Sequence, residues 1–201
     1  VAEEWAGLGY YARARNLHRA ARLVRDEHGG RVPTDFDALS SLPGIGRSTA
    51  GAILSLAAHQ RHPILDGNVK RVRTRVFRVE GYPGDTAVAR QLWALADECT
   101  PADRVANYTQ AIMDLGASLC ARRKPACIQC PLADGCLAHR DGVAAELPAR
   151  KPPKARPRKA TVMLLCVRPD GAVLLERRPN AGIWGGLWGL PEAASIEAAA
   201  G

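Results

Sequence analysis

Four cysteines in the second half of the chain have the spacing of a metal-binding site. Cys120, Cys127, Cys130 and Cys136 form a C-x6-C-x2-C-x5-C array. Four convergent thiolates have few uses in proteins besides holding a metal ion or an iron–sulfur cluster. The thiolates by themselves are equally consistent with a structural zinc ion and with a [4Fe-4S] cluster.

A turn that contains two glycines lies upstream of the cysteines. Residues 41–48 read Ser-Leu-Pro-Gly-Ile-Gly-Arg-Ser, which places Gly44 and Gly46 one residue apart. Two glycines permit a tight turn that exposes successive backbone amides at the start of the next helix, and these amides suit a phosphate group. An ordinary turn between two helices is the alternative. Further on, Asp66 and Asn68 lie at the start of a predicted helix, where either residue is typical of an N-cap.

The composition favours a globular protein with a polyanionic partner. The formal net charge is +8, the pI is near 9.5 and 47% of the 201 residues are hydrophobic. Lysine and arginine can neutralise phosphates and release counterions, although a solvated basic face has the same composition. No apolar run approaches the roughly 20 residues needed to span a bilayer, and no signal peptide is visible. The clustered cysteines fit a reduced, cytoplasmic compartment better than a disulfide scaffold, and Cys99 and Cys166 are expected to be small apolar core residues.

Apolar residues at helical spacing predict an all-α domain over residues 1–138, which includes the cysteine loop 120–136. The predicted helical segments are 10–28, 34–42, 47–58, 68–79, 86–99 and one that begins near 101–103. Thr34 is the expected N-cap of the segment 34–42.

A change of composition predicts a linker and a second domain. Residues 139–160 end in a basic, proline-rich stretch, which disfavours regular structure. From residue 161 the chain is rich in β-branched and apolar residues, and 161–167 and 172–176 are predicted to form a β-hairpin around the turn 169–171. Residues 161–201 therefore begin a different domain.

These motifs together resemble the helix-hairpin-helix DNA glycosylases, and among them the adenine-specific type. The resemblance covers nearly the whole chain and is densest over 5–16, 41–72 and 110–136. It implies a mainly α fold with an iron–sulfur loop, followed by a truncated α/β Nudix-like domain. It also implies that the four cysteines hold a [4Fe-4S] cluster, which fixes a basic loop so that the loop is presented to the DNA backbone, and which takes no part in catalysis. Arg122, Arg123 and Lys124 lie in that loop.

The position of Asp66 after the hairpin matches the catalytic aspartate of the family. Cleavage of a glycosidic bond builds positive charge on the sugar, and a carboxylate beneath the ring stabilises it or captures it covalently. Asn68 is then expected to orient that carboxylate or the nucleophilic water.

Ser48 distinguishes two branches of the superfamily. Endonuclease III-like enzymes carry a lysine at the matching position, which forms a Schiff base and cleaves the strand. A serine hydroxyl cannot do so, and the resemblance therefore implies a monofunctional glycosylase. Ser48 and Lys70 are both expected to contact DNA, and Lys70 is expected to touch phosphate and not to act as the nucleophile.

The segment 7–16, Gly-Leu-Gly-Tyr-Tyr-Ala-Arg-Ala-Arg-Asn, also matches the adenine-specific pattern. A tyrosine on a short loop can wedge into the base stack and offset the cost of base flipping. The resemblance places Tyr10 against the lesion base and makes Tyr11 a second DNA contact, while packing of both rings in the core is the alternative.

The resemblance predicts removal of adenine opposite 8-oxoguanine or guanine in double-stranded DNA, by a monomer. In the family, the Nudix-like domain reads the 8-oxoguanine. The chain opens at Val1 without an initiator methionine, and the family's general-acid glutamate is expected upstream of Tyr10, before residue 1. We therefore expect residues 1–201 to be a fragment with impaired activity on its own. The alternatives are an endonuclease III-like glycosylase/lyase and a DNA-binding module without catalysis.

Overall fold

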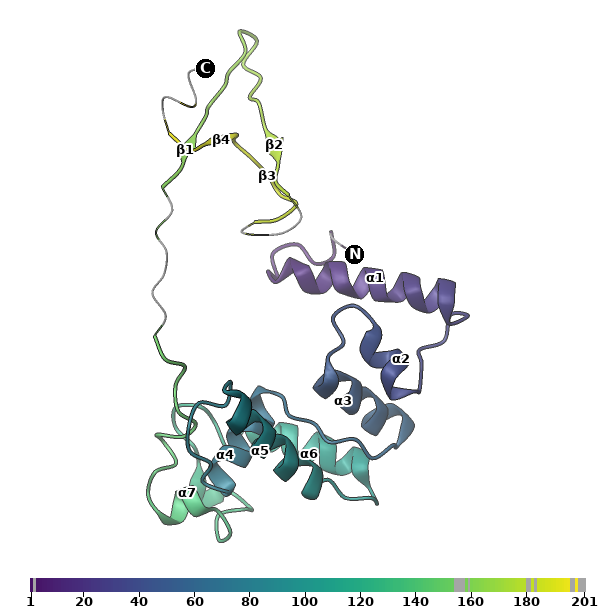
Figure 1. Cartoon of the computed structure of the whole chain (residues 1–201), viewed down its shortest axis with the longest axis vertical. Coiled ribbons are helices and arrows are strands. Elements are labelled where there is room, and N and C mark those ends of the chain that lie inside the picture. Colours follow the sequence, from purple (N-terminus) through teal and green to yellow (C-terminus); the bar gives the residue numbers. More distant parts are fainter. Residues whose placement is uncertain are drawn as a thin grey trace. The chain divides into compact units, whose positions relative to one another are not determined.

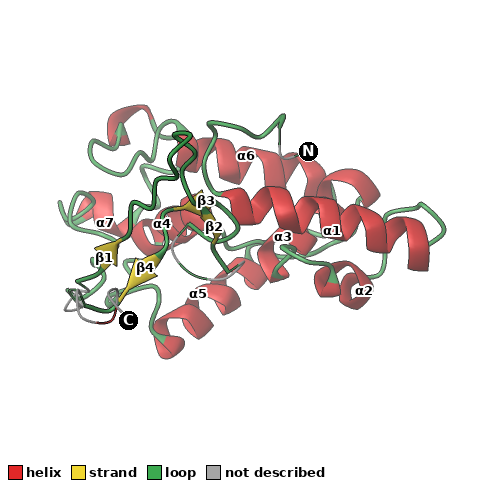
Figure 2. Cartoon of the chain, turned by 90° about the horizontal axis from the view of Figure 1, so that it is seen from above, coloured by secondary structure: helices red, strands yellow, loops and turns green. Residues whose placement is uncertain are grey.

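The computed structural model describes residues 1, 3–153, 158, 160–179, 182, 184–195 and 198. The chain divides into two compact units, Val1–Pro152 and Pro153–Gly201 (Figure 1). The named helices belong to the first unit and the named strands to the second (Figure 2). None of the helices in the described ranges combines the length and the apolar character that a membrane crossing needs.

The first unit opens with the helix α1 (Tyr11–Glu27), close to its predicted bounds. Ala14 and Ala20 are buried, and Ala20 packs against the hairpin that follows. The helix ends where Gly29 and Gly30 adopt positive φ angles of 60° and 77°, which glycine reaches without steric cost.

The helices α2 (Phe36–Ser41) and α3 (Arg47–Ala58) form the predicted hairpin. Leu39, Ala50 and Leu54 are at most 1% exposed and fix the two helices against each other. The expectation that Thr34 caps α2 is wrong. Asp35 is the N-cap, because it has an extended backbone (φ −85°) and its side chain accepts a hydrogen bond of 2.8 Å from the amide of Ala38.

The main core of the first unit lies among the helices α4 (Gly67–Val76), α5 (Thr86–Glu98) and α6 (Val105–Ala117). α4 ends at Val76, three residues before the predicted end, and the amide of Val79 bonds to the carbonyl of Thr74. The buried core residues are Ile64, Leu65, Val69, Val72, Val79, Leu92, Ala96 and Ile112.

The cysteine segment follows α6 and contains little regular structure. It holds the 3-10 turn η1 (Cys127–Gln129) and the short helix α7 (Leu137–Arg140), which packs against α4. Its backbone therefore depends on contacts from neighbouring elements for its shape.

The second unit contains short antiparallel strand pairs. β1 (Val162–Met163) pairs with β4 (Glu192–Ala193), and β2 (Glu176–Arg177) pairs with β3 (Trp188–Gly189). The predicted hairpin is only partly correct: its two arms meet at one isolated bridge, Val167–Val173, because the longer pairings are made with later segments. None of the described residues of this unit is buried, so the expectation that Cys166 is a core residue is wrong.

Candidate active site and cysteine centre

Asp66 lies directly before α4, where the hairpin meets the helical core. Its backbone is extended (φ −76°, ψ −176°), and its Oδ1 accepts a hydrogen bond of 2.8 Å from the amide of Val69. Its Oδ2 accepts no hydrogen bond from the described part of the chain. The positive end of the helix dipole favours a carboxylate at this position. Asp66 is therefore an N-cap that keeps one oxygen available for another interaction.

Ser48 connects the hairpin to this carboxylate. Its Oγ accepts a hydrogen bond of 2.9 Å from the amide of Leu65, the residue before Asp66. The start of α3 thus fixes the entry to α4. The contact of Ser48 with DNA stays a prediction, and its hydroxyl hydrogen remains able to donate.

Asn68 contacts α6 and a neighbouring arginine. Its Oδ1 accepts a hydrogen bond of 2.9 Å from Nη2 of Arg71, and the same Nη2 also donates to the carbonyl of Gly116. A Cβ at Gly116 would lie 2.7 Å from the Cβ of Asn68, so α4 and α6 approach closely here only because this residue is glycine. Lys70 is half-buried and makes no side-chain hydrogen bond or ion pair within the described ranges.

The hairpin turn has the predicted geometry for exposing its backbone. Gly44 has a φ of +83°, and a Cβ there would lie 2.9 Å from the Cβ of Asn16 on α1. Gly46 is the N-cap of α3, with an ordinary φ of −92° and open space where a Cβ would stand. The first amides of α3 have no partner within the helix, as at every helix start. The turn therefore combines these amides with an unobstructed approach at Gly46.

The four cysteines of the array line one cavity. Most of its other lining residues are apolar. All six cysteines of the chain are free thiols. Among the described residues, no group of three or more cysteine, histidine or acidic side chains is arranged to hold a metal ion in this structure.

The thiol of Cys127 is perturbed by its surroundings. Burial raises the pKa of Cys127, and negative charge on Cys136, Cys120 and Cys130 raises that pKa further. The positive charge of Arg75 acts in the opposite direction. A bound metal cation would lower the pKa of this thiol, as Arg75 does, and so favour the thiolate.

Two arginines of α4 bind the backbone of the cysteine loop. Nε of Arg71 donates to the carbonyl of Cys120 at 2.7 Å. Arg75, which is 1% exposed, donates to the carbonyls of Ala121 (2.8 Å) and Arg122 (3.1 Å) and to Sγ of Cys120 (3.2 Å). The helix that Asp66 caps therefore also holds the first cysteine.

The predicted basic loop is available to a partner. Arg122, Arg123 and Lys124 are all exposed. Ile128, between the second and third cysteines, is 94% exposed. The loop thus presents cations and one apolar side chain on the same short segment.

The tyrosine loop presents Tyr10 and partly covers Tyr11. Tyr10 is 79% exposed and has a φ of +48°, whereas Tyr11 is 39% exposed and begins α1. The indole of Trp5 donates to the carbonyl of Gly9 at 2.9 Å, and the guanidinium of Arg13 lies 5.3 Å from the centre of the Tyr10 ring. A non-glycine residue with positive φ costs energy, which is common at functional sites.

Comparisons with known proteins agree with this arrangement. The profile of the helix-hairpin-helix motif matches residues 27–56, and that of the NUDIX domain matches residues 162–200. The adenine DNA glycosylase of Buchnera aphidicola subsp. Acyrthosiphon pisum (strain APS) is 36% identical over 188 residues, which are 94% of this chain and 53% of that protein. The human adenine DNA glycosylase is 34% identical over an alignment of 236 positions, which covers 95% of this chain and 43% of that protein. Over nearly its whole length, this chain is therefore similar to adenine DNA glycosylases.

The chain spans about half the length of these adenine DNA glycosylases. Solved structures of related glycosylases have the same fold. A thermostable thymine-DNA glycosylase matches with a TM-score of 0.62 and 32% identity, over 70% of this chain and 65% of that one. A trapped endonuclease III–DNA covalent intermediate matches with a TM-score of 0.57 and 27% identity, over 69% of this chain and 63% of that one.

Several residues at this site were missed in the analysis of the sequence alone. Arg71, Arg75 and Gly116 act through partners more than 40 positions away, and no local pattern indicates such contacts. Leu8, by contrast, is 68% exposed two residues before Tyr10, and its position between two glycines was a readable signal.

Proposed function

We propose that this chain carries the adenine-excising part of a base-excision repair glycosylase. The reaction is hydrolysis of the N-glycosidic bond of adenine opposite 8-oxoguanine or guanine in double-stranded DNA. The observation that supports it most is Asp66, held through Oδ1 with Oδ2 available, beside a hairpin suited to phosphate. The names of its relatives, adenine DNA glycosylases, support the choice of base.

Asp66 acts on the sugar. As the bond to adenine breaks, positive charge develops on the sugar ring, and a fixed carboxylate stabilises it or captures it covalently. The hydrogen bond from the Val69 amide holds one oxygen, so the carboxylate needs little reorganisation when the charge appears. Asn68 positions α4 against α6 through Arg71, and its amide nitrogen is a candidate donor to the attacking water.

The strand stays intact after the base has left. The Ser48 hydroxyl, bonded to the Leu65 amide, has no amine with which to form a Schiff base. Lys70 contacts DNA phosphate, together with Arg122, Arg123 and Lys124. Gly44 and Gly46 shape the turn that receives a phosphate, and Tyr10 wedges between bases with Tyr11 behind it.

The cysteine cavity suits a [4Fe-4S] cluster, which the resemblance to the iron–sulfur glycosylases favours over a zinc ion. Cys120, Cys127, Cys130 and Cys136 would each supply one thiolate. Four thiols that line one largely apolar cavity provide the ligands that such a cluster needs. When bound, the cluster cross-links the loop and fixes its basic residues. The chain's own residues perform the catalytic chemistry.

The second unit contributes recognition of the opposite base. Its match to the NUDIX domain motivates this role. The protein is expected to bind DNA as a monomer. Its free thiols suit a reducing, cytoplasmic compartment.

The test is single-turnover base release from a duplex with adenine opposite 8-oxoguanine, quenched with and without hot alkali. It uses the longest polypeptide that carries this sequence. The expected wild-type result is strand breaks only after alkali. Asp66→Asn is isosteric and should lower the rate by about 10³-fold or more, comparable to the loss of other electrostatic transition-state contacts. Its affinity for the duplex should change by less than about threefold, or under about 0.7 kcal/mol.

Other outcomes favour the rivals. Strand breaks without alkali would indicate a glycosylase/lyase, as the likeness to endonuclease III allows. Tight duplex binding with no base release, in wild type and Asp66→Asn alike, would indicate a DNA-binding module.

A further inference from the structure

Arg75 is a buried cation without a protein anion. It is 1% exposed, and in the described part of the chain it forms no ion pair with a carboxylate. Its acceptors are the neutral carbonyls of Leu147, Cys120, Ala121 and Arg122 and the Sγ of Cys120. Burying a charge is costly unless it is both hydrogen-bonded and compensated. The carbonyls supply the hydrogen bonds but no compensating negative charge.

Two neighbouring arginines of α4 differ from Arg75 in their contacts. Arg71 is only half-buried, and the charges of Cys120 and Asp66 both act favourably on it. Arg73 is 5% exposed and also forms no ion pair with a carboxylate in the described part of the chain, but it contacts the rings of Phe77 and Tyr108. Of these three, Arg75 alone donates to a cysteine sulfur.

The anions that Arg75 lacks are available in the adjoining cavity. Arg75 lines that cavity with all four cysteines of the array, and its Nη1 lies 3.2 Å from Sγ of Cys120. Four cysteines that bind metal do so as thiolates, so a loaded site carries net negative charge next to the guanidinium. A hydrogen bond from a charged donor to sulfur also tunes an iron–sulfur centre.

We propose that Arg75 is the counter-ion of the cysteine-bound group. Its charge is compensated only when the thiolates of the array are formed and loaded, and Cys120 is the ligand on which it acts directly. The inference rests on the proposed [4Fe-4S] cluster. Arg75 is a positioning residue: it stabilises the loaded centre, raises its reduction potential and leaves the glycosidic chemistry to Asp66.

The experiment compares Arg75→Met with Arg75→Lys and with the control Arg73→Met. The control removes a second buried arginine from the same helix, away from the cysteines. After anaerobic reconstitution of the 201-residue chain, three quantities are measured: the rate of cluster loss to a chelator by visible absorbance, the reduction potential, and Tm with and without the cluster. Arg75→Met should lose the cluster at least tenfold faster than wild type and have a lower potential. Binding of the cluster should raise the Tm of this variant less than it raises the Tm of wild type.

The conservative variant separates charge from hydrogen bonding. Arg75→Lys keeps the cation, so its reduction potential should stay close to that of wild type. It cannot reproduce the forked hydrogen bonds to several carbonyls. The inference is overturned if Arg75→Lys has the potential and the rate of cluster loss of Arg75→Met. It is also overturned if both Arg75 variants match Arg73→Met in all three quantities.

Failure of the cofactor proposal would look different. Wild type would then take up no iron or sulfide in metal analysis, whatever residue stands at position 75. A wild type that binds the cluster, with an Arg75→Met variant that retains it equally well, would contradict only the role of Arg75.

Discussion

The hairpin and the cysteine loop are both proposed to contact DNA, but they are held in different ways. The hairpin is stabilised from within, since α2 and α3 bury Leu39, Leu42, Ala50 and Leu54 against each other and against Ala20 of α1. The cysteine loop contains only the turn η1 as regular structure, and Cys136 is its single buried side chain among the described residues 120–136.

The loop is instead held by its neighbours. Arg71 and Arg75 reach from α4 to its carbonyls, and its sulfurs surround a cavity. A segment with few apolar contacts has little stability of its own. The hairpin should therefore keep its structure when the bound group is removed, and the cysteine loop should not.

Removal of a cysteine ligand is the most disruptive test of this difference. Cys136→Ala should prevent cluster loading, because three thiolates would remain. If about 4 kcal/mol of stability is lost, Tm falls by roughly 8–16 °C for a chain of this size. Hydrogen exchange should accelerate over 120–136 and stay slow over 47–58. Cys99→Ala is the control, since Cys99 lies outside the array. Equal loss of protection in both regions would contradict the comparison.

Duplex binding by the hairpin should depend on a different feature, which is the backbone conformation at Gly44. Gly44→Ala puts a Cβ at φ +83° and 2.9 Å from Asn16, and the conformation alone costs about 1–2 kcal/mol. We expect weaker duplex binding, by about tenfold, with cluster absorbance unchanged. Gly46→Ala is the matched control, because its φ is ordinary and its Cβ would meet no atom within 4 Å. Equal effects of the two substitutions would show that conformation at the turn is unimportant.

The same contrast explains what could be predicted from the sequence. The hairpin is encoded locally, and its turn and second helix were predicted correctly; the single error was the cap, where Asp35 and not Thr34 accepts the bond. The cysteine array was equally readable as a pattern. The arginines that hold it were not, because Arg75 meets Cys120 across 45 residues.

The strands of the second unit show the same limitation. The run 161–167 is apolar without strict alternation, so its face and register are weakly specified. Its pairing partner, β4 at Glu192–Ala193, comes from nearly 30 residues later, and only the bridge at Val167–Val173 could be expected from local sequence.

Substitution of Tyr10 tests whether an exposed ring at the start of α1 acts on DNA. Tyr10→Ala should weaken binding to lesion duplex by about tenfold, since aromatic stacking on a base is worth about 1–3 kcal/mol. It should leave Tm nearly unchanged, because the ring is 79% exposed. Tyr10→Phe keeps the stacking and should bind like wild type. Tyr11→Ala should affect Tm more than binding, as its ring is better covered, and the reverse order would assign the wedge to Tyr11.

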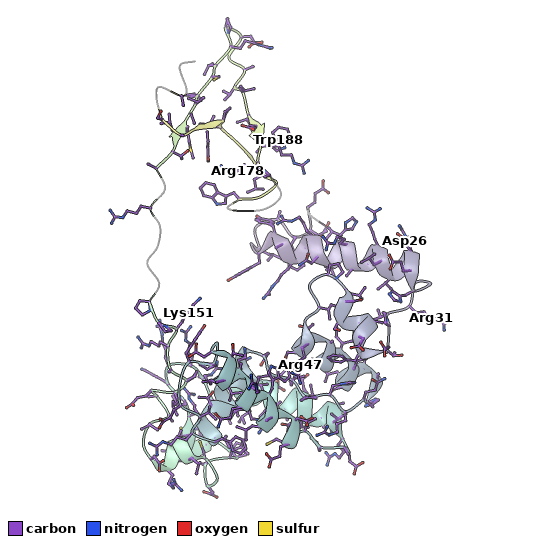
Figure 3. The ribbon with its side chains drawn as sticks, in the orientation of Figure 1. Asp26, Arg31, Arg47, Lys151, Arg178 and Trp188 are labelled. Atoms are coloured by element: carbon purple, nitrogen blue, oxygen red, sulfur yellow. The ribbon has the colours of Figure 1, made fainter. Side chains whose placement is uncertain are left out.

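The smallest expected effect concerns how the hairpin is joined to the core. Arg47, the first residue of α3 (labelled in Figure 3), lies 3.8 Å from the centre of the Trp93 ring on α5. A double-mutant cycle with Arg47→Ala and Trp93→Leu should give a coupling free energy of unfolding of about 0.5–1 kcal/mol. A control cycle pairs Trp93→Leu with Arg31→Ala, an exposed arginine that makes no ring contact in the described part of the chain, and should be additive. The apolar cluster of α2 and α3 does not involve Arg47 or Trp93. Retention of the iron–sulfur cluster should not change in any of these variants. Zero coupling would mean that the hairpin is joined to the core by the Ser48–Leu65 hydrogen bond and apolar packing alone.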